Sequence, residues 1–377
     1  MDELVDIAVV GAGPAGTATA LRALQLRPQA TVLLLDAAGF PRDKTCGDGI
    51  SAHVLELLDA LDVPGPAKLG HPAPRMRLRG PGGALVDRTC ARPNRVIPRA
   101  LFDAELVAAA VARGARLRRH RVRRMEVRAD RVVLDGSLAA RVVVGADGAN
   151  STVRRLLGAP VAPPSTTAVA IRGYAPTAVD PDALVIEFAH GRALAYAWSF
   201  PLAGGGSNVG YGVFDRRGGG SRAELLDGLR ELLPGHEPDP ETVRGHHLPL
   251  STAPRHHPDG RVLLAGDAAA MVNPLTGEGI FDAVASGVLA GRAALLGAGA
   301  GAAHRRAMRR TFARHHTHTD VLARLLPHGR VLDAALAAAA RDQRVFDAAV
   351  DLGLGRGTAS PGALGKVAAG YAALLRA

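Results

Sequence analysis

Three glycine-rich stretches hold the residues of this chain whose types and spacing could do chemistry. They cover residues 11–16, 145–148 and 266–279, and each follows a short apolar run. Glycine lets the backbone come close to a phosphate, and a helix that starts after such a turn offers free N–H groups and a positive dipole. The second and third stretches also contain a carboxylate, Asp147 and Asp267, that can accept hydrogen bonds from sugar hydroxyls. The combination predicts a nucleotide cofactor.

The first stretch has the order of elements that dinucleotide binding needs. Residues 4–10 are typical of a buried parallel strand, and residues 14–26 have a helical pattern. Between them, Gly11 permits the tight turn, Gly13 allows a pyrophosphate to approach, and Gly16 lets helix and strand pack closely.

A second apolar run, residues 31–35, completes a strand–helix–strand unit and ends at Asp36. A carboxylate at this position, 25 residues after Gly11, can accept hydrogen bonds from ribose hydroxyls. The residues expected to hold a dinucleotide in this unit are Gly11, Gly13, Ala15, Gly16 and Asp36.

Together, the three stretches resemble the FAD-binding fingerprints of the two-domain flavoprotein fold shared by aromatic hydroxylases and geranylgeranyl reductases. The resemblance implies that Asp147 serves both FAD and a pyridine nucleotide. It also implies that Arg99, at the start of a predicted helix over residues 98–113, lies near the FAD pyrophosphate.

The third stretch is expected to approach the flavin end of FAD. Asp267 can take the ribityl hydroxyls, and residues 273–280 open a helix whose N–H groups would face the flavin N1–C2=O edge. Reduced flavin is negatively charged there, so a positive helix end stabilises it. The cofactor-binding residues expected here are Gly266, Asp267, Pro274, Gly277, Gly279 and Ile280.

Two further segments distinguish among flavoprotein families. Residues 41–49 read Pro-Arg-Asp-Lys-Thr-Cys-Gly-Asp-Gly, and residues 196–201 read Tyr-Ala-Trp-Ser-Phe-Pro. Both resemble segments of the geranylgeranyl reductase family, and the resemblance extends over residues 1–300. It implies that Arg42, Cys46 and Gly47 contact FAD.

The second of these segments contains the single tryptophan of the chain. A flat isoalloxazine ring needs an apolar wall on its substrate side, and an alkene has no polar handle, so shape must position it. The substrate-binding residues expected are Tyr196, Trp198, Phe200 and Pro201. Catalytic roles are expected for Cys46, Asp48 and Trp198, with Cys46 or Asp48, or a water that they hold, as the proton source.

These features predict an FAD-dependent reductase of carbon–carbon double bonds in isoprenoid-type substrates, which are small and apolar. NADPH or NADH would reduce the FAD, or an electron-donor protein would. The alternative is an FAD-dependent monooxygenase of the same fold, because the third stretch serves both chemistries. A flavin halogenase would need a relay lysine, and none lies between Lys44 and Lys68. A non-catalytic FAD-binding protein is a further alternative.

The expected fold is α/β, with a Rossmann-type FAD-binding domain, an inserted and mainly antiparallel substrate domain, and a helical C-terminal segment. The FAD-binding domain is assigned to residues 1–75, 90–160 and 255–303. The substrate domain is assigned to residues 76–89 and 161–254, and the helical segment to residues 304–377.

Composition excludes several other classes. The net charge is +11, but the basic residues are scattered and aromatic residues make up only 3%, which argues against nucleic-acid binding. Two cysteines, Cys46 and Cys90, and paired histidines lack the spacing of a metal site. The acidic start and the lack of a long uncharged apolar run predict a cytoplasmic protein with at most peripheral membrane contact. The sequence makes no prediction of oligomeric state.

Overall fold

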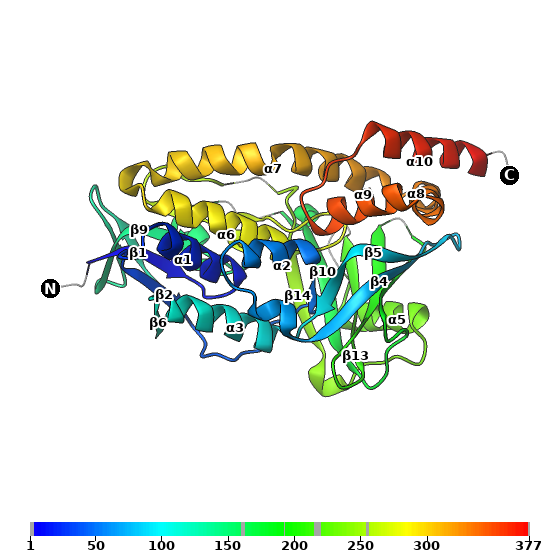
Figure 1. Ribbon diagram of the computed structural model, residues 1–377, viewed down its shortest axis with the longest axis horizontal. Helices are drawn as coiled ribbons and strands as arrows, with labels where there is room; N and C mark the ends of the chain where they lie inside the picture. Colours follow the sequence, from blue (N-terminus) through cyan, green and yellow to red (C-terminus); the bar gives the residue numbers. More distant parts are fainter. Residues whose placement is uncertain (1–3, 160–162, 192, 215–219, 254–255, 376–377) are drawn as a thin grey trace.

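The computed structural model describes residues 4–159, 163–191, 193–214, 220–253 and 256–375. Two β-sheets lie next to each other, and a layer of C-terminal helices extends over both (Figure 1). The expected mixed α/β architecture, with its second sheet and helical end, is confirmed.

The first sheet brings the glycine-rich stretches together. It consists of β1 (Leu4–Val10), β2 (Val32–Asp36), β6 (Arg116–Arg119), β7 (Met125–Val127), β8 (Val132–Leu134), β9 (Leu138–Gly145) and β15 (Val262–Leu264). The order is β6-β2-β1-β9-β8-β7, with β15 beside β9, and the strands from β6 to β9 and β15 are parallel. Because parallel strands end at the same edge, the turns after β1, β9 and β15 meet there.

The helices that cover this sheet are packed through small residues. They include α1 (Pro14–Leu26), α3 (Arg99–Ala112) and α6 (Ile280–Ala294). A Cβ atom added at Gly287 would lie 2.3 Å from the Ala15 carbonyl oxygen, and one at Gly291 would lie 2.3 Å from that of Thr19. The α1 and α6 backbones therefore touch, which fixes the start of each helix relative to the other.

The second sheet is mainly antiparallel. It consists of β3 (Gly49–Ile50), β4 (His71–Arg79), β5 (Leu85–Val96), β10 (Thr167–Ala175), β11 (Ala183–Phe188), β12 (Leu194–Pro201), β13 (Ser207–Phe214) and β14 (Arg244–Pro249). The order is β14-β10-β13-β12-β11-β4-β5-β3. One face packs against α5 (Arg222–Leu232), where Leu229 joins Ala197 and Val209 in a small core.

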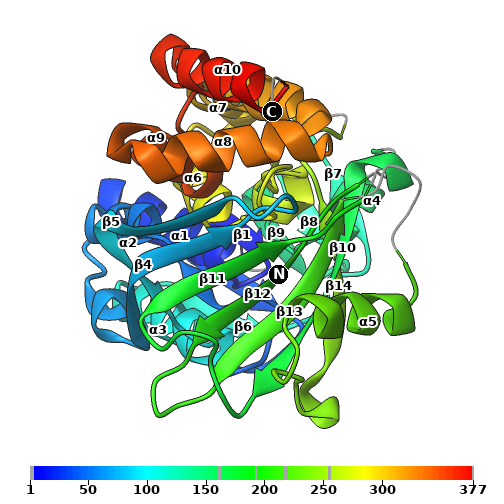
Figure 2. The ribbon, with the colours of Figure 1, turned by 90° about the vertical axis from the view of Figure 1, so that its right-hand side faces the viewer.

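The C-terminal helices cover the other face of the second sheet (Figure 2). They are α7 (Ala300–Leu325), α8 (Gly329–Arg341), α9 (Gln343–Leu354) and α10 (Pro361–Leu374). Leu332 and Phe346 belong to one core with Met76 and Leu184 of the sheet. The helical segment is therefore an integral wall of the molecule, and α7 links it to the first sheet through a contact between His304 and the Leu264 carbonyl oxygen.

Two short helices complete the chain near the sheet edge, α2 (Ala52–Asp59) and α4 (Thr152–Leu156). The domain boundaries given above remain predictions, and residues 1–3, 160–162, 192, 215–219, 254–255 and 376–377 within them lie outside the described residues.

Candidate active site

The turn after β1 exposes bare backbone toward a cavity. Gly11 has φ of +100°, and a Cβ atom there would lie 2.2 Å from the Ala146 carbonyl oxygen. A Cβ atom at Gly16 would lie 1.8 Å from the Gly11 carbonyl oxygen. Gly13 and Ala15 line the cavity at the N-terminus of α1. This cradle fits a pyrophosphate, because side chains at these positions would fill it.

The carboxylate expected at the ribose also holds the turn. Asp36 accepts hydrogen bonds from the N–H groups of Ala12 and Ala38, both at 2.9 Å. Its side chain lines the cavity, and an Arg42 guanidinium nitrogen lies 3.9 Å away. The Asp36 side chain thus holds the turn in place and lies where it would meet a ribose.

Arg99 is held in place by an aspartate that sequence reasoning missed. The buried Arg99 guanidinium donates two hydrogen bonds, of 2.7 and 2.8 Å, to the Asp103 carboxylate. Arg42 also lies 3.3 Å from Asp103. The helical spacing of Arg99 and Asp103 was a signal for this pair. The Arg42 and Arg99 guanidinium groups thus lie together at the cavity wall, where each can donate further hydrogen bonds to phosphates.

Asp147 acts on backbone within its own turn. Its carboxylate accepts hydrogen bonds from the N–H groups of Thr152 and Val153 and from the Ser151 hydroxyl. Asp147 also lines the cavity. It therefore fixes the start of α4, and the proposed contact with FAD would add to this role.

The third stretch forms the far wall of the cradle. Gly266 has φ of +61°, Asp267 lines the cavity, and Pro274 is buried without lining it. Gly277 has φ of +69°, and a Cβ atom there would lie 3.3 Å from the Tyr196 hydroxyl oxygen. Small residues are therefore required where this loop meets the second sheet.

Glu278 caps the helix that this loop opens. Its Oε1 atom accepts hydrogen bonds from the N–H groups of Ile280, at 2.8 Å, and Phe281, at 2.9 Å. Gly279 and Ile280 line the cavity beside it. Burial raises the pKa of Glu278 to about 7. Sequence reasoning missed this acid, although its place before the first helical residue is typical of capping.

Asn208 joins the two segments that distinguish the family. Trp198 donates its indole N–H to Asn208 Oδ1 at 3.0 Å. The Asn208 amide nitrogen donates to the Cys46 carbonyl oxygen at 2.9 Å and to Asp48 Oδ2 at 2.8 Å. The Trp198 ring covers Gly210, where a Cβ atom would lie 2.2 Å from Cζ2. The loop over residues 41–49 is thereby fixed to the second sheet.

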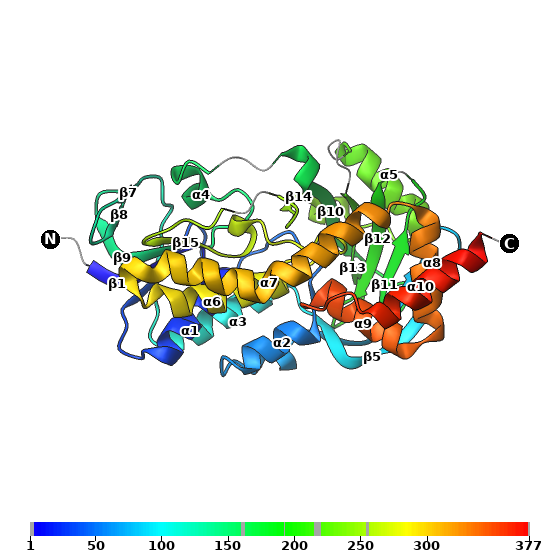
Figure 3. The same ribbon diagram turned by 90° about the horizontal axis from the view of Figure 1, so that it is seen from above.

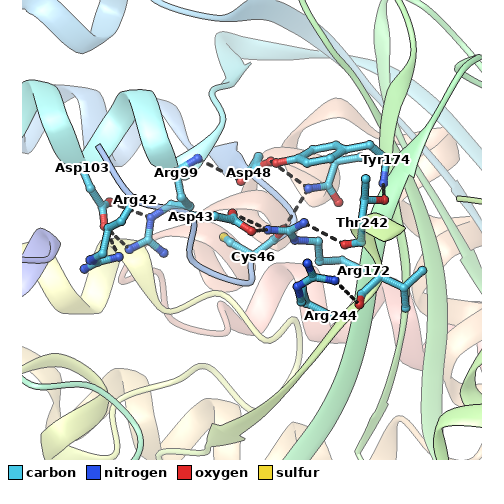
Figure 4. A network of polar contacts seen from close by, with 12 residues as sticks. Arg42, Asp43, Cys46, Asp48, Arg99, Asp103, Arg172, Tyr174, Thr242 and Arg244 are labelled. Atoms are coloured by element: carbon cyan, nitrogen blue, oxygen red, sulfur yellow. Dashed lines mark hydrogen bonds and ion pairs between the residues drawn. The ribbon is translucent and has the colours of Figure 1, made fainter. Parts of the chain in front are cut away.

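Asp48 belongs to this loop, and its side chain points toward Tyr174 (Figure 4). It does not line the cavity. It is fully buried, with φ of +61°. Besides Asn208, its carboxylate accepts from the Tyr174 hydroxyl at 2.9 Å and from the Arg99 N–H at 3.2 Å. Burial raises its pKa. Nearby, Arg172 pairs with Asp43 at 2.6 Å and further fixes the loop.

Cys46 lies at the cavity wall in front of Asp48. Burial raises the pKa of the thiol, with the Arg99 guanidinium opposing this effect. The thiol is therefore neutral and holds its proton near physiological pH. Gly47 beside it leaves room for Trp198, because a Cβ atom would lie 3.3 Å from the indole nitrogen.

Lys44 and His246 form a buried pair that sequence reasoning did not assign to the site. Lys44 Nζ lies 2.8 Å from His246 Nε2, and both side chains line the cavity. Burial lowers the pKa of Lys44, and burial together with the Lys44 ammonium lowers the pKa of His246 to about 4. His246 is thus neutral and accepts a hydrogen bond from Lys44. His246 lies on β14 and Lys44 lies in the loop over residues 41–49, 202 positions away in the chain, so no local pattern signals the pair.

The cavity has a volume of about 820 Å³ and continues from the cradle into an apolar chamber. Tyr196, Trp198 and Phe200 line it, while Pro201 is buried at the end of β12 and does not. The chamber walls include Leu78, Ile186, Phe214, Leu336, Phe346 and Leu354. Among the described residues, no group of His, Cys, Asp and Glu could hold a metal ion. One cavity therefore combines a nucleotide cradle with an apolar space.

The fold and cradle define an FAD-binding protein of the two-domain flavoprotein class, and comparisons with known proteins agree. Residues 4–293 match the FAD binding domain family. Menaquinone reductase of Mycolicibacterium smegmatis is 33% identical over 317 residues, which cover 77% of this chain and 76% of that protein. Digeranylgeranylglycerophospholipid reductase of Methanoculleus marisnigri is 31% identical over 311 residues, with coverage of 77% and 76%.

Solved structures show how widely the fold is shared. A geranylgeranyl bacteriochlorophyll reductase-like protein from Thermoplasma acidophilum superposes with a TM-score of 0.81 at 20% identity, covering 99% of this chain and 98% of that one. A flavin-dependent brominase superposes with a TM-score of 0.69 at 15% identity, covering 99% of each chain.

The chain belongs to the geranylgeranyl reductase family of FAD-dependent oxidoreductases. Within the described residues, no helix is long and apolar enough to span a membrane.

Proposed function

We propose that this chain reduces carbon–carbon double bonds in prenyl-type substrates. The observation that carries the proposal is the single cavity that joins the nucleotide cradle to the apolar chamber. The names of the two relatives, menaquinone reductase and digeranylgeranylglycerophospholipid reductase, support a substrate with a prenyl chain.

The cradle residues would hold FAD, with Gly11 and Gly13 at the pyrophosphate, Asp36 at the ribose and Asp267 at the ribityl chain. When bound, FAD supplies hydride to one carbon of the alkene. Arg99 and Arg42 offset the phosphate charge from one side of the cavity.

The chamber positions the alkene by shape and excludes water. Its walls near the cradle are Trp198 and Phe200, and its far walls come from α8 and α9. Trp198 is held by its hydrogen bond to Asn208, so its ring presents a fixed apolar face. A fixed, dry wall keeps an apolar chain in one orientation, which is how binding contributes to rate when no polar group is available.

Cys46 is the proton source in this proposal. Its Sγ atom holds a proton at the cavity wall, and the second alkene carbon receives that proton while the first receives hydride. The resulting thiolate is stabilised by the Arg99 guanidinium. Asp48 is a positioning residue, because all its contacts hold the loop and it does not line the cavity.

The electrons are proposed to come from NADPH or NADH. The arginine-rich cavity edge favours the phosphates of such a nucleotide. An electron-donor protein is the alternative source. Following the loss of visible flavin absorption after anaerobic addition of NADPH or NADH distinguishes them, because a donor-dependent enzyme would stay oxidised with either nucleotide.

The test of the proposed function is anaerobic mixing of the reduced holoenzyme with geranylgeranyl compounds and with menaquinone. Flavin absorption should return, and mass spectrometry should show a product heavier by two hydrogens. Flavin that stays reduced with every polyprenyl compound would overturn the proposal. A product heavier by one oxygen, formed only in air, would favour the monooxygenase alternative.

A further inference from the structure

Two of the C-terminal helices, α7 and α10, carry exposed apolar side chains at or near their C-terminal ends or along their length. Val321 and Leu325 at the end of α7 are 53% and 45% exposed, and Leu364 and Leu375 on and just after α10 are 46% and 55% exposed. Both helices lie on the face turned toward the viewer in Figure 3. Helices that face water normally carry charge on that side.

α10 departs strongly from this rule. Its residues 361–374 contain one charged side chain, Lys366, and this lysine forms an ion pair with Asp342 of the loop between α8 and α9. Its other exposed residues are proline, glycine, alanine and leucine. The outer face of α10 is therefore apolar, and it has no unpaired charge of its own among the described residues.

The apolar chamber reaches this same face. Leu322 and Leu326 from the end of α7, and Ala363, Leu364 and Val367 from α10, all line the cavity. Leu364 both lines the cavity and is nearly half exposed. The hydrogen bond from the Ala359 N–H to His318 Nδ1 holds the start of α10 against α7. The exposed apolar surface and the chamber are thus continuous.

A basic stripe adjoins the apolar surface along α7. Arg306, Arg309, Arg310 and Arg314 are exposed at helical spacing, and none of the four forms an ion pair with another described residue. Residues 301–377 contain twelve lysines and arginines against five aspartates, which accounts for seven of the chain's eleven net positive charges. Charge without acidic partners beside an apolar face matches the chemistry of an anionic bilayer.

We propose that α7 and α10 form a membrane-docking face for anionic lipid, through which a prenyl chain passes from the bilayer into the chamber. The four arginines contact lipid headgroups, and Val321, Leu325, Leu364 and Leu375 enter the acyl boundary. The passage of a prenyl chain rests on the proposed function, but the binding of this face to lipid is independent of it. The concentrated positive charge disfavours a second copy of this face as the occupant.

The test is flotation of the full-length holoenzyme with vesicles of phosphatidylcholine alone or with added phosphatidylglycerol. Binding is expected only with phosphatidylglycerol and should weaken as salt is raised. The V321E/L375E variant, which changes two exposed residues that do not line the cavity, should bind at least about tenfold more weakly. The L101E variant is the matched control, because Leu101 is 53% exposed on α3 at the opposite side of the molecule and should leave binding unchanged.

Two outcomes would overturn the docking proposal. One is no binding to phosphatidylglycerol vesicles at low salt. The other is a dimer in light scattering that V321E/L375E, but not L101E, converts to a monomer, because the face would then bind a second copy. Turnover of a short prenyl alcohol in detergent is measured in parallel. Its retention in V321E/L375E separates loss of docking from loss of the reductase activity itself, because neither residue lines the cavity.

Discussion

At the scale of single residues, the site depends on fixed rather than free polar groups. Asn208 makes three hydrogen bonds that tie Trp198, the Cys46 carbonyl and Asp48 together. The sequence predicted that Cys46, Asp48 and Trp198 belong to one site. It could not predict that Asp48 faces away from the cavity, because its partner Tyr174 is 126 positions away in the chain.

The proton assignment predicts different effects for the two cysteines. Cys46→Ala should lower the rate of alkene reduction about a hundredfold while FAD absorption stays unchanged, because the proton donor at the wall is lost. Cys90→Ala should leave the rate unchanged, because Cys90 is buried in β5 and does not line the cavity. Single-turnover kinetics under anaerobic conditions measure both. Equal rates for Cys46→Ala and wild type would contradict the assignment.

Glu278 gives a prediction about pH. Its pKa is raised from 4.5 to about 7 by burial, so the folded chain binds a proton that the unfolded chain releases between these values. This contribution to stability is complete below pH 4.5 and is lost as pH rises through 7, by about 3 kcal/mol at most. Glu278→Gln keeps an oxygen that can accept from Ile280 and Phe281.

Thermal unfolding should therefore show Glu278→Gln more stable than wild type at pH 8 and similar to it at pH 5. A difference of the same size at both pH values would show that this carboxyl does not titrate in the folded state.

At the scale of elements, hydrophobic periodicity and glycine placement were sufficient to predict the start of the first sheet. β1 and α1 were predicted with their observed bounds, because a buried strand, a glycine turn and a helix have strong local patterns. α6 ends at Ala294 and α7 starts at Ala300. Gly297, with φ of +59°, makes the break. The packing of α8 and α9 on β4 and β11 rests on contacts far apart in sequence, which local patterns do not encode.

The contact between α1 and α6 predicts that one glycine cannot be enlarged. Gly287→Ala would push a methyl group to 2.3 Å from the Ala15 carbonyl oxygen, which should cost about 2 kcal/mol and weaken FAD binding. Gly362→Ala in α10 is the control, because a Cβ atom there meets nothing within 4 Å. Chemical denaturation compares them, and equal stability of the two variants would rule out tight packing here.

At the scale of the whole molecule, two sheets and the C-terminal helices enclose one cavity. The resemblance predicted the cradle and the aromatic wall, but the tail showed no motif, so its role as the opposite wall came only from the structure. The Lys44 and His246 pair was missed for the same reason, because its partners lie on different elements.

The chamber predicts a dependence on substrate length. Ala339→Phe fills space at the α8 wall and should raise KM for long polyprenyl substrates at least about tenfold, with FAD absorption unchanged. Ala108→Phe, on the exposed side of α3, is the control and should leave KM unchanged. Steady-state assays with short and long substrates test this. An unchanged KM for long substrates in Ala339→Phe would show that the prenyl chain does not bind at the α8 wall.

The most direct test of a shared cavity uses the fluorescence of Trp198, the single tryptophan of the chain. Trp198 lines both the cradle side and the chamber, so FAD added to apoprotein should quench most of its emission. A polyprenyl compound added afterwards should change the residual emission with saturation. Protein that takes up no FAD, or a Trp198 signal indifferent to both ligands, would contradict the account.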